Sequence, residues 1–408
     1  MRLQVSGAEK DDSLGIIRKK VQIGSTSVVT PIKGTKYLNA VEYIREPKRI
    51  NEITKQVKES TLNNFHEKEE NSRDFVRKSK KYFLEDSFNV VITNFISPNL
   101  PTEELTKTLA DVIYSASDKV ICLPTVKNKT YQIEGVTSGG KPKFTVQEES
   151  FAKYLDFQKT IIAQIRNSNS KDILGIVPFG LPPKYMIKLV DMYFEKEIYS
   201  FVIDANTSNI LNREPNLRSF LSHVGDKAKE NGSSIADSYI HAINVGTSSF
   251  TADYVPADDF LNFFTYIDVV GTISKSRFAP NKNIQIGYPA EPKKKVFMRT
   301  KYSYDLADKL PDQEPYTEFK KHGSSAIVKK YNEKEQFMEA KKVNSLIGDI
   351  ELTKYVHSKK GITEISWKKL ENISGRSNFS HSAGFEICRR RNHCRNWRQH
   401  YHQRICYC

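Results

Sequence analysis

The sequence predicts an α/β fold, a (β/α)₈ TIM-like barrel with an N-terminal β-ribbon and a C-terminal helical extension. Apolar, β-branched segments alternate with amphipathic segments from about residue 89 to residue 290, the pattern of parallel strands joined by crossover helices. The amphipathic segments place apolar residues at i, i+3 and i+4, the stripe that packs on a sheet. No G-x-G-x-x-G loop follows a predicted strand, which argues against the alternative, a doubly wound open sheet.

The N-terminal part supplies the ribbon and a charged segment. Residues 19–38, KKVQIGSTSVVTPIKGTKYL, predict two strands with a polar turn that begins at Gly24. Residues 43–83 follow and predict helices dense in charge. Their basic side chains form either a solvated face or an arm that contacts phosphates, and the acidic residues among them keep both interpretations open.

The central region supplies seven predicted strands, and one more strand is expected from the N-terminal part. The seven are NVVITNF (89–95), KVICLPTV (119–126), ILGIVPFG (173–180), SFVIDANT (200–207), YIHAINVG (239–246), YIDVVGT (266–272) and NIQIGYP (283–289). Helices are predicted between them at residues 101–117, 151–166, 182–197, 216–230 and 257–266. Prolines at the start of the first and third of these helices suit the first helical turn.

The C-terminal part predicts a polar connection, closing helices and a tail of foreign composition. The connection covers 289–315, and helices are expected within 331–361. The tail, 385–408, holds four cysteines and six arginines, and its spacing favours a disordered terminus over a zinc site. The expected organisation is therefore residues 1–84, 85–290, 291–375 and 376–408, in the order ribbon with charged segment, barrel, connection with helices, and tail.

Charge and cysteine content limit the classes of function. Lysine and arginine number 63 and aspartate and glutamate 48, a net charge of +15 that favours a nucleic acid as partner. No secretion signal or membrane-length apolar run is present, so we expect a cytoplasmic protein without membrane contact. Cys122 is the one cysteine of the body, and we expect no cofactor and no metal site there.

A basic stretch beside tyrosines is the predicted nucleic-acid contact. Basic side chains interleaved with aromatic rings suit a single strand, because phosphates contact cations while bases stack on rings. An ordinary surface connection is the alternative. The residues concerned are Lys293, Lys294, Lys295, Arg299 and Lys301.

The ends of the predicted strands supply the candidate catalytic and binding residues, since barrel enzymes collect their reacting groups there. Two aspartates, Asp204 and Asp268, suggest the paired carboxylates that displacement at a glycosidic carbon requires. The alternative for Asp268 is a helix cap or an ion pair with Arg277. The other strand-end candidates are Asn94, Gly180, Asn206, Asn244 and, in the turn VGTSS, Gly246.

Two further residues have the character of core positions. His241 lies within the apolar strand YIHAINVG and is expected to be a satisfied core histidine. Cys122 is expected to be a small buried hydrophobe, because no basic partner lies near it in the sequence.

Several segments, in order, resemble the tRNA-guanine transglycosylase family. They are VQIGSTSVVTPIKGT (21–35), VVITNF (90–95), ILGIVPFGLPPKYMIKLVD (173–191), HAINVG with PADDFLNFFTYIDVV (241–270), and YNEKEQFMEAKKVNSLIGDIEL (331–352). The resemblance implies a barrel acting on tRNA, or less favourably DNA, in which Asp268 attacks the ribose and displaces a guanine or deazaguanine base. It also implies a homo- or heterodimer.

Other family positions have no counterpart. The third-strand aspartate is absent from the stretch around Thr125, Pro178 replaces the base-reading glutamine, and the zinc-binding cysteines are missing from 280–330. Two functions are therefore weighed. One is a divergent transglycosylase that uses Asp268. The other is a non-catalytic nucleic-acid-binding or partner subunit, and a barrel enzyme on a small phosphorylated substrate is a third, weaker idea.

Overall fold

The computed structural model describes most of the chain. The described residues are 3–11, 14–36, 49–127, 132–136, 142–168, 171–246, 253–272, 294–321 and 325–376. The predicted strand at 283–289, the tail beyond residue 376, and the candidates Arg277 and Lys293 lie outside them.

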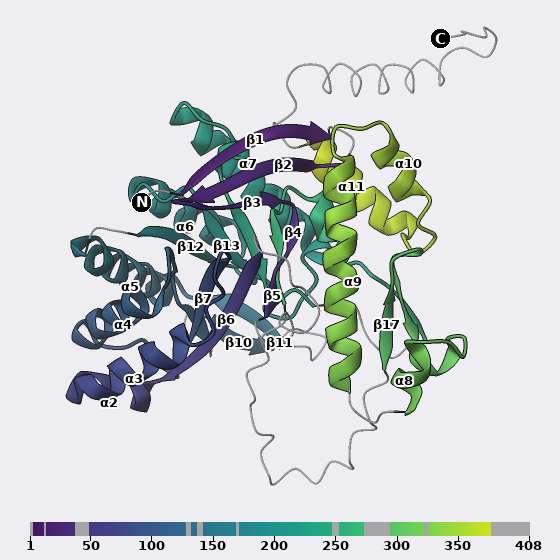
Figure 1. The fold of residues 1–408 in the computed structure, drawn as a ribbon. Helices are drawn as coiled ribbons and strands as arrows, with labels where there is room; N and C mark the ends of the chain where they lie inside the picture. Colours follow the sequence, from purple (N-terminus) through teal and green to yellow (C-terminus); the bar gives the residue numbers. More distant parts are fainter. Residues whose placement is uncertain are drawn as a thin grey trace, which may run out of the picture.

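The N-terminal part is an antiparallel sheet of β1 (Gln4–Asp11), β2 (Ile16–Ile23) and β3 (Thr26–Thr30). The predicted ribbon is confirmed as β2 and β3, and β1 adds a strand on the other side of β2. Gly24 takes a φ of 56° in the two-residue turn between β2 and β3, a conformation that suits glycine. This sheet covers the amino ends of the parallel strands (Figure 1).

Two parallel sheets form the centre of the molecule, which is a mixed α/β protein as predicted. One has the order β4-β16-β14-β13-β12-β8 and the other the order β5-β6-β7-β9, and every pairing in both is parallel. The strands are β4 (Ile32–Lys33), β5 (Thr35–Lys36), β6 (Ile50–Lys58), β7 (Phe88–Ile96), β8 (Val120–Cys122), β9 (Thr125–Lys127), β12 (Asp172–Pro178), β13 (Phe201–Asp204), β14 (Ile240–Ile243) and β16 (Val269–Val270).

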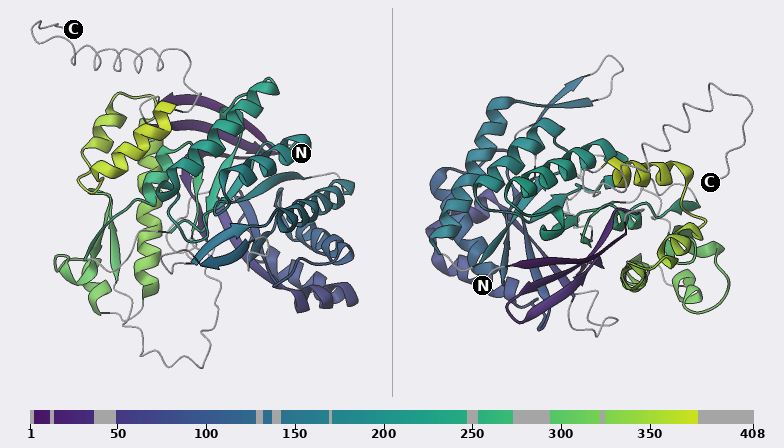
Figure 2. Two further views of the ribbon diagram at one scale, coloured as in Figure 1. Left: turned by 180° about the vertical axis from the view of Figure 1, so that it is seen from behind. Right: turned by 90° about the horizontal axis from the view of Figure 1, so that it is seen from above.

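Four of the predicted helices are confirmed on the outside of these sheets (Figures 1 and 2). Thr102 caps the first by accepting a hydrogen bond from the Leu105 amide, and Pro183 starts the third. Each turns an apolar face to the sheets. They are α4 (Glu103–Ala116), α5 (Glu148–Asn167), α6 (Pro183–Glu195) and α7 (Glu214–Glu230).

The helix predicted at 257–266 is instead a short 3₁₀ segment, η3 (Phe260–Phe264). All five of its residues are buried, so it has no polar face to present to water, and Tyr266 at a φ of 61° turns the chain directly after it.

The segment predicted to be helical at 43–83 contains a strand. Ile50, Ile53 and Val57 are buried, and β6 pairs with β7 along its whole length. The charged residues beyond it form two helices, α2 (Glu59–Glu67) and α3 (Glu69–Lys80). The predicted boundary between residues 84 and 85 therefore falls inside a continuous parallel sheet.

The predicted connection at 289–315 contributes to a second antiparallel sheet, with β15 (Tyr254–Pro256), β18 (Ser303–Leu306) and β17 (Lys295–Met298) in that order. The closing helices predicted in 331–361 are confirmed, and they extend further. They are α8 (Tyr316–Lys321), α9 (Ser325–Leu346), α10 (Glu351–His357) and α11 (Glu364–Arg376). A hairpin of β10 (Gln132–Val136) and β11 (Pro142–Val146) completes the strands of the described chain.

One hydrophobic core runs through these parts, with members from Leu14 to Ile373. A second, small cluster of Val296, Ala307, Leu310, Phe319 and Val328 lies in the lobe of β17 and α8. Within the described residues no helix is long and apolar enough to cross a membrane.

Candidate functional site

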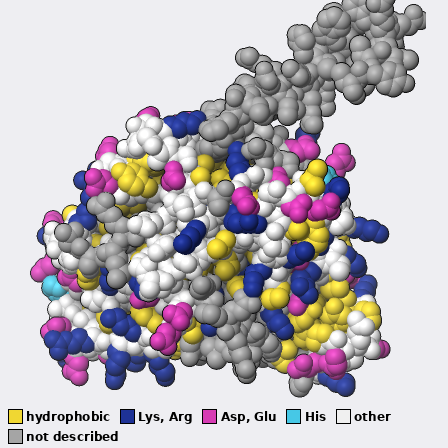
Figure 3. All heavy atoms as spheres, turned by 45° about the horizontal axis from the view of Figure 1, so that its top comes forward, with side chains coloured by type: hydrophobic (Ala, Val, Ile, Leu, Met, Phe, Trp, Pro, Cys, Tyr) yellow, Lys and Arg dark blue, Asp and Glu magenta, His cyan; other side chains and the backbone are white. Residues whose placement is uncertain are grey.

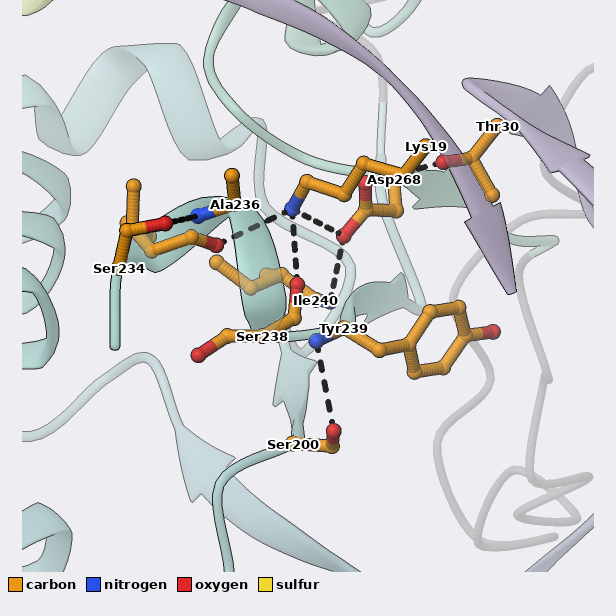
Figure 4. Close-up of polar contacts among 10 residues, drawn as sticks. Lys19, Thr30, Ser200, Ser234, Ala236, Ser238, Tyr239, Ile240 and Asp268 are labelled. Atoms are coloured by element: carbon orange, nitrogen blue, oxygen red, sulfur yellow. Dashed lines mark hydrogen bonds and ion pairs between the residues drawn. The ribbon is translucent and has the colours of Figure 1, made fainter. Parts of the chain in front are cut away.

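Asp268 lies in a buried ion pair (Figure 4). Its Oδ2 atom is 3.0 Å from the Lys19 ammonium and accepts a hydrogen bond from the Ile240 amide at 2.8 Å. Its Oδ1 atom accepts from the Thr30 hydroxyl at 3.1 Å. The side chain is 2 % exposed, so the carboxylate is enclosed by donors rather than open to a ligand.

The expectation that Asp268 ends its strand is wrong. The residue directly precedes β16, and its own amide bonds the carbonyl of Ile240, the first residue of β14. Active sites of parallel barrels lie at the opposite, carboxyl ends, whereas residues at the amino ends serve stability. Burial raises the pKa of Asp268, although Lys19 and the hydrogen bonds oppose that rise.

Lys19, a residue of β2, connects the antiparallel sheet to Asp268. Besides Asp268, its ammonium donates to the carbonyls of Ser238 at 2.8 Å and Ile235 at 3.4 Å, just before β14. All three ammonium protons thus have acceptors in the interior. The geometry makes the Lys19–Asp268 pair a structural clamp at the amino ends of the strands.

Asp204 does lie at a carboxyl end, as predicted, because it is the last residue of β13. Its Oδ1 atom accepts hydrogen bonds from the Asn244 side-chain amide at 2.8 Å and from the Asn206 backbone amide at 3.0 Å. The structure therefore brings three predicted site residues together. Asp268 is not among them, since Ile240 and Asn244 are four residues apart along β14, about 13 Å in a strand.

The backbone around Asp204 is strained. Asn206, Thr207 and Asn244 have φ values of 48°, 66° and 54°, in the left-handed region that non-glycine residues seldom adopt. Gly246 passes so close to the Thr207 carbonyl that a Cβ there would collide with it. Clustered strain of this kind is typical of binding and catalytic sites.

Glu52 and His241 form a buried pair that the sequence analysis did not predict. The His241 Nε2 atom lies 2.7 Å from Glu52 Oε1, and its Nδ1 atom lies 3.2 Å from the Tyr239 hydroxyl. His241 is fully buried with polar partners, which agrees with the expectation of a satisfied core histidine. The signal for Glu52 was a carboxylate between the apolar residues Ile50 and Ile53.

Thr272 links Glu52 to Asp204. Both the amide and the hydroxyl of Thr272 donate to Glu52 Oε2 at 2.9 Å, and its carbonyl accepts from the Asn244 amide at 3.3 Å. Asn244 in turn donates to Asp204. The result is one polar network across the carboxyl ends of β16, β14 and β13, with Glu52 and His241 beneath it.

Two glycines make room for the Glu52 carboxylate. A Cβ at Gly34 or at Gly271 would collide with its Oε1 atom. The His241 and Thr272 contacts outweigh burial and hold the pKa of Glu52 below its usual range. Cys122 is buried as expected, and burial together with the charges of Asp204 and Glu52 raises the pKa of its thiol.

Asn94, Gly180 and Arg213 lie at the same ends of the strands. Asn94 Oδ1 accepts from the Thr125 hydroxyl at 2.5 Å, while its buried side-chain nitrogen has no hydrogen-bond partner among the described residues. Gly180 follows β12 and lies beside the Arg213 guanidinium, which donates to the Phe179 carbonyl at 3.3 Å. Arg213, an exposed cation next to the Asp204 network, was not among the sequence candidates.

The predicted nucleic-acid contacts in β17 and its turn are engaged within the protein. Arg299 pairs with Glu335 at 2.5 Å, Lys301 with Asp305 at 3.0 Å, and Lys294 donates to the Phe319 carbonyl. Lys295 is buried. Glu335 and Asp305 are mostly covered, so moving Arg299 or Lys301 to a phosphate would leave a largely buried carboxylate without its partner. The geometry of the described residues therefore does not support a phosphate-binding stretch at this place. On the face drawn in Figure 3, basic and acidic side chains are interspersed.

No group of three or more histidine, cysteine, aspartate or glutamate side chains in the described part of the chain could hold a metal ion. No model of a known protein family matches the sequence, and a search of curated proteins found no match.

Proposed function

We propose that the two parallel sheets are the two arcs of one eight-stranded (β/α)₈ barrel. Gly34 alone separates β4 from β5, and Leu123 and Pro124 alone separate β8 from β9. β4 and β5 are thus two halves of one interrupted strand, and β8 and β9 are two halves of another. β4 and β8 form the edges of one sheet, and β5 and β9 form the edges of the other. Counted in this way, the parallel neighbours return to their starting strand after eight steps, as a barrel requires.

We further propose that the protein is a nucleic-acid-binding barrel, similar to the tRNA-guanine transglycosylases in architecture, that does not exchange bases. The observation that carries this proposal is the position of Asp268, enclosed by Lys19 at the amino ends. A displacement at the ribose carbon needs a nucleophile with an accessible lone pair. The net charge of +15 favours a polyanion, and tRNA is preferred over DNA on the family resemblance.

The ligand site of this proposal is the strand-end network. Asn94 has a buried side-chain nitrogen without a hydrogen-bond partner among the described residues, which suits an acceptor atom of a flat heterocycle. Arg213 beside Gly180 supplies a cation for an adjoining phosphate. A base held without chemistry is the role expected of a binding or partner subunit.

The test is a base-exchange assay with labelled guanine or a deazaguanine on tRNA, run beside a tRNA-binding assay. We expect binding without incorporation. Incorporation by the wild type that is lost in Asp268→Asn at unchanged folding would overturn the proposal. Absence of tRNA binding at low salt would remove nucleic acid as the partner.

A second candidate function is base exchange in which Asp204 is the nucleophile. It is favoured by the place of Asp204 at a carboxyl end, within the strained segment. This candidate predicts incorporation that Asp204→Asn abolishes and Asp268→Asn leaves intact, apart from lost stability. The pair of variants therefore separates the two candidates.

A further inference from the structure

A groove lies between α3 and α4 on the outside of the parallel sheets, where these helices pack side by side (Figure 1). Its volume is about 710 Å³. Phe65, Val76 and Val112 contribute its apolar lining, and polar side chains of both helices line it as well. The groove lies outside the strand-end network.

One wall of the groove is cationic. Arg73, Arg77 and Lys80 of α3 line it, and their spacing of four and three residues places them on one face of the helix. At 1.5 Å per residue they span about 10 Å. A row of this length can reach more than one phosphate of a nucleic-acid strand.

The two arginines are available to an external anion. Their side chains are 73 % and 82 % exposed, and among the described residues each pairs only within its own helix, Arg73 with Glu69 and Arg77 with Asp74. Exposed pairs of this kind contribute little stability, so a guanidinium can turn to a phosphate without leaving a buried charge behind. A guanidinium can also bind a phosphate through two parallel hydrogen bonds.

The end of the groove beside Lys80, the last residue of α3, carries a cation that is not balanced by a carboxylate partner among the described residues. Lys80 is exposed, and no carboxylate in the described part of the chain pairs with it. Lys171 lies nearby and donates to the carbonyls of Tyr114 and Ser117 at the end of α4. Burial lowers the pKa of Lys171 and the charge of Lys80 lowers it further, while the charge of Asp118 raises it.

Two acidic side chains, Glu69 and Asp111, also line the groove and offset part of its positive charge. Glu69 is held by Arg73, and Asp111 accepts a hydrogen bond from the Gln164 side chain at 2.9 Å. Neither of these two described carboxylates pairs with Lys80. The groove therefore combines an apolar base, a row of three cations and an unbalanced charge at one end, which together fit a phosphodiester backbone.

We propose that the α3–α4 groove binds the sugar–phosphate backbone of a nucleic acid, with Arg73, Arg77 and Lys80 each contacting a phosphate. The inference rests on the proposed nucleic-acid-binding function and names the surface that carries it. It replaces the stretch at 293–301, whose described cations are engaged inside the protein.

The test compares two triple variants of the full chain. The first is Arg73→Gln/Arg77→Gln/Lys80→Gln. The control, Lys107→Gln/Lys159→Gln/Lys188→Gln, removes the same charge from exposed helical positions outside the groove, each paired with a carboxylate as Arg73 and Arg77 are. Affinity is measured from about 50 to 200 mM salt, a range over which phosphate contacts weaken strongly. The probes are an unmodified tRNA transcript and a duplex DNA. Equal thermal melting checks that both variants are folded.

We expect the groove variant to bind at least tenfold more weakly at low salt, and its log–log salt slope to fall by about 2 to 3, since each phosphate contact contributes about 0.7 to 0.9. The control variant should keep most of the slope. A loss on both probes assigns the groove to phosphates in general, and a loss on tRNA alone assigns it to RNA. Equal effects of both variants would overturn the inference while nucleic-acid binding stands, whereas a wild type that binds neither probe removes the proposed function itself.

Discussion

At the scale of single residues, the pair Lys19 and Asp268 decides how the resemblance to transglycosylases is interpreted. An aspartate in the sequence FTYIDVV is compatible with a nucleophile, but its partner lies 249 residues away in the chain, in the N-terminal sheet. Local pattern carries no information on such a contact. Similarly, Glu52 was missed because its partners His241 and Thr272 lie 189 and 220 positions away.

The first prediction concerns the buried pair. Lys19→Met should lower the free energy of unfolding by about 3 to 5 kcal/mol, because it leaves the Asp268 carboxylate buried without its counter-charge. Denaturant titration measures the loss. The double variant with Asp268→Asn should lose less than the sum of the single losses. Lys107→Met, which removes an exposed pair with Glu103, is the control and should leave the midpoint unchanged; a similar loss there would show that the effect is not due to burial.

The second prediction concerns pH and Glu52. Its folded-state pKa is depressed, so the stability it contributes is complete above its ordinary pKa of about 4.3 and is lost as the pH falls through the folded value. We expect the wild type to lose more stability than Glu52→Gln between about pH 6 and pH 3. Asp259, whose pKa burial raises, contributes with the opposite sign in both proteins and cancels in the comparison. Parallel stability curves for the two proteins would contradict the assignment.

At the scale of elements, the apolar strands were predictable and their exact ends were not. β7, β12, β13 and β14 follow continuous β-branched runs, which is how strands buried on both faces appear in a sequence. β6 was hidden by charge, because its polar positions alternate irregularly with Ile50, Ile53 and Val57. β16 contains only Val269 and Val270. Asp268 therefore lies just before the strand, at its amino end, and not at the predicted carboxyl end.

The strained turn after β13 gives a prediction at this scale. Thr207 is exposed, β-branched and at a φ of 66°, so Thr207→Gly should raise the free energy of unfolding by about 0.5 to 1 kcal/mol, the relief of strain exceeding the entropy lost by glycine. Thr160→Gly in the middle of α5 is the matched control and should destabilise. A loss of stability in Thr207→Gly as well would mean that the turn is not strained in solution.

At the scale of the whole molecule, one large core runs through the described chain from the N-terminal sheet to the C-terminal helices. The antiparallel sheet at the N-terminus, the parallel strands and the C-terminal helices all contribute to it. The small cluster around Phe319 is the exception, with five buried members of its own.

This division predicts the order of local opening. Amides of α8 should exchange with solvent faster than those of β13 and β14, because the cluster beneath α8 buries much less apolar surface than the main core. Native-state hydrogen exchange followed by mass spectrometry measures the difference. Equal protection of α8 and β13 would show that the lobe and the core unfold as one unit.

The clamp between Lys19 and Asp268 also constrains how this protein can change over time. A variant that loses either charge alone has the other charge buried without a partner, which lowers its stability. Such a single variant is selected against before a second substitution can compensate for it. We therefore expect the two positions to vary together, although most of the chain lies between them. Among relatives of this protein, we expect lysine at the first position to occur with an acidic residue at the second, and relatives without the lysine to be those in which the aspartate is accessible for chemistry.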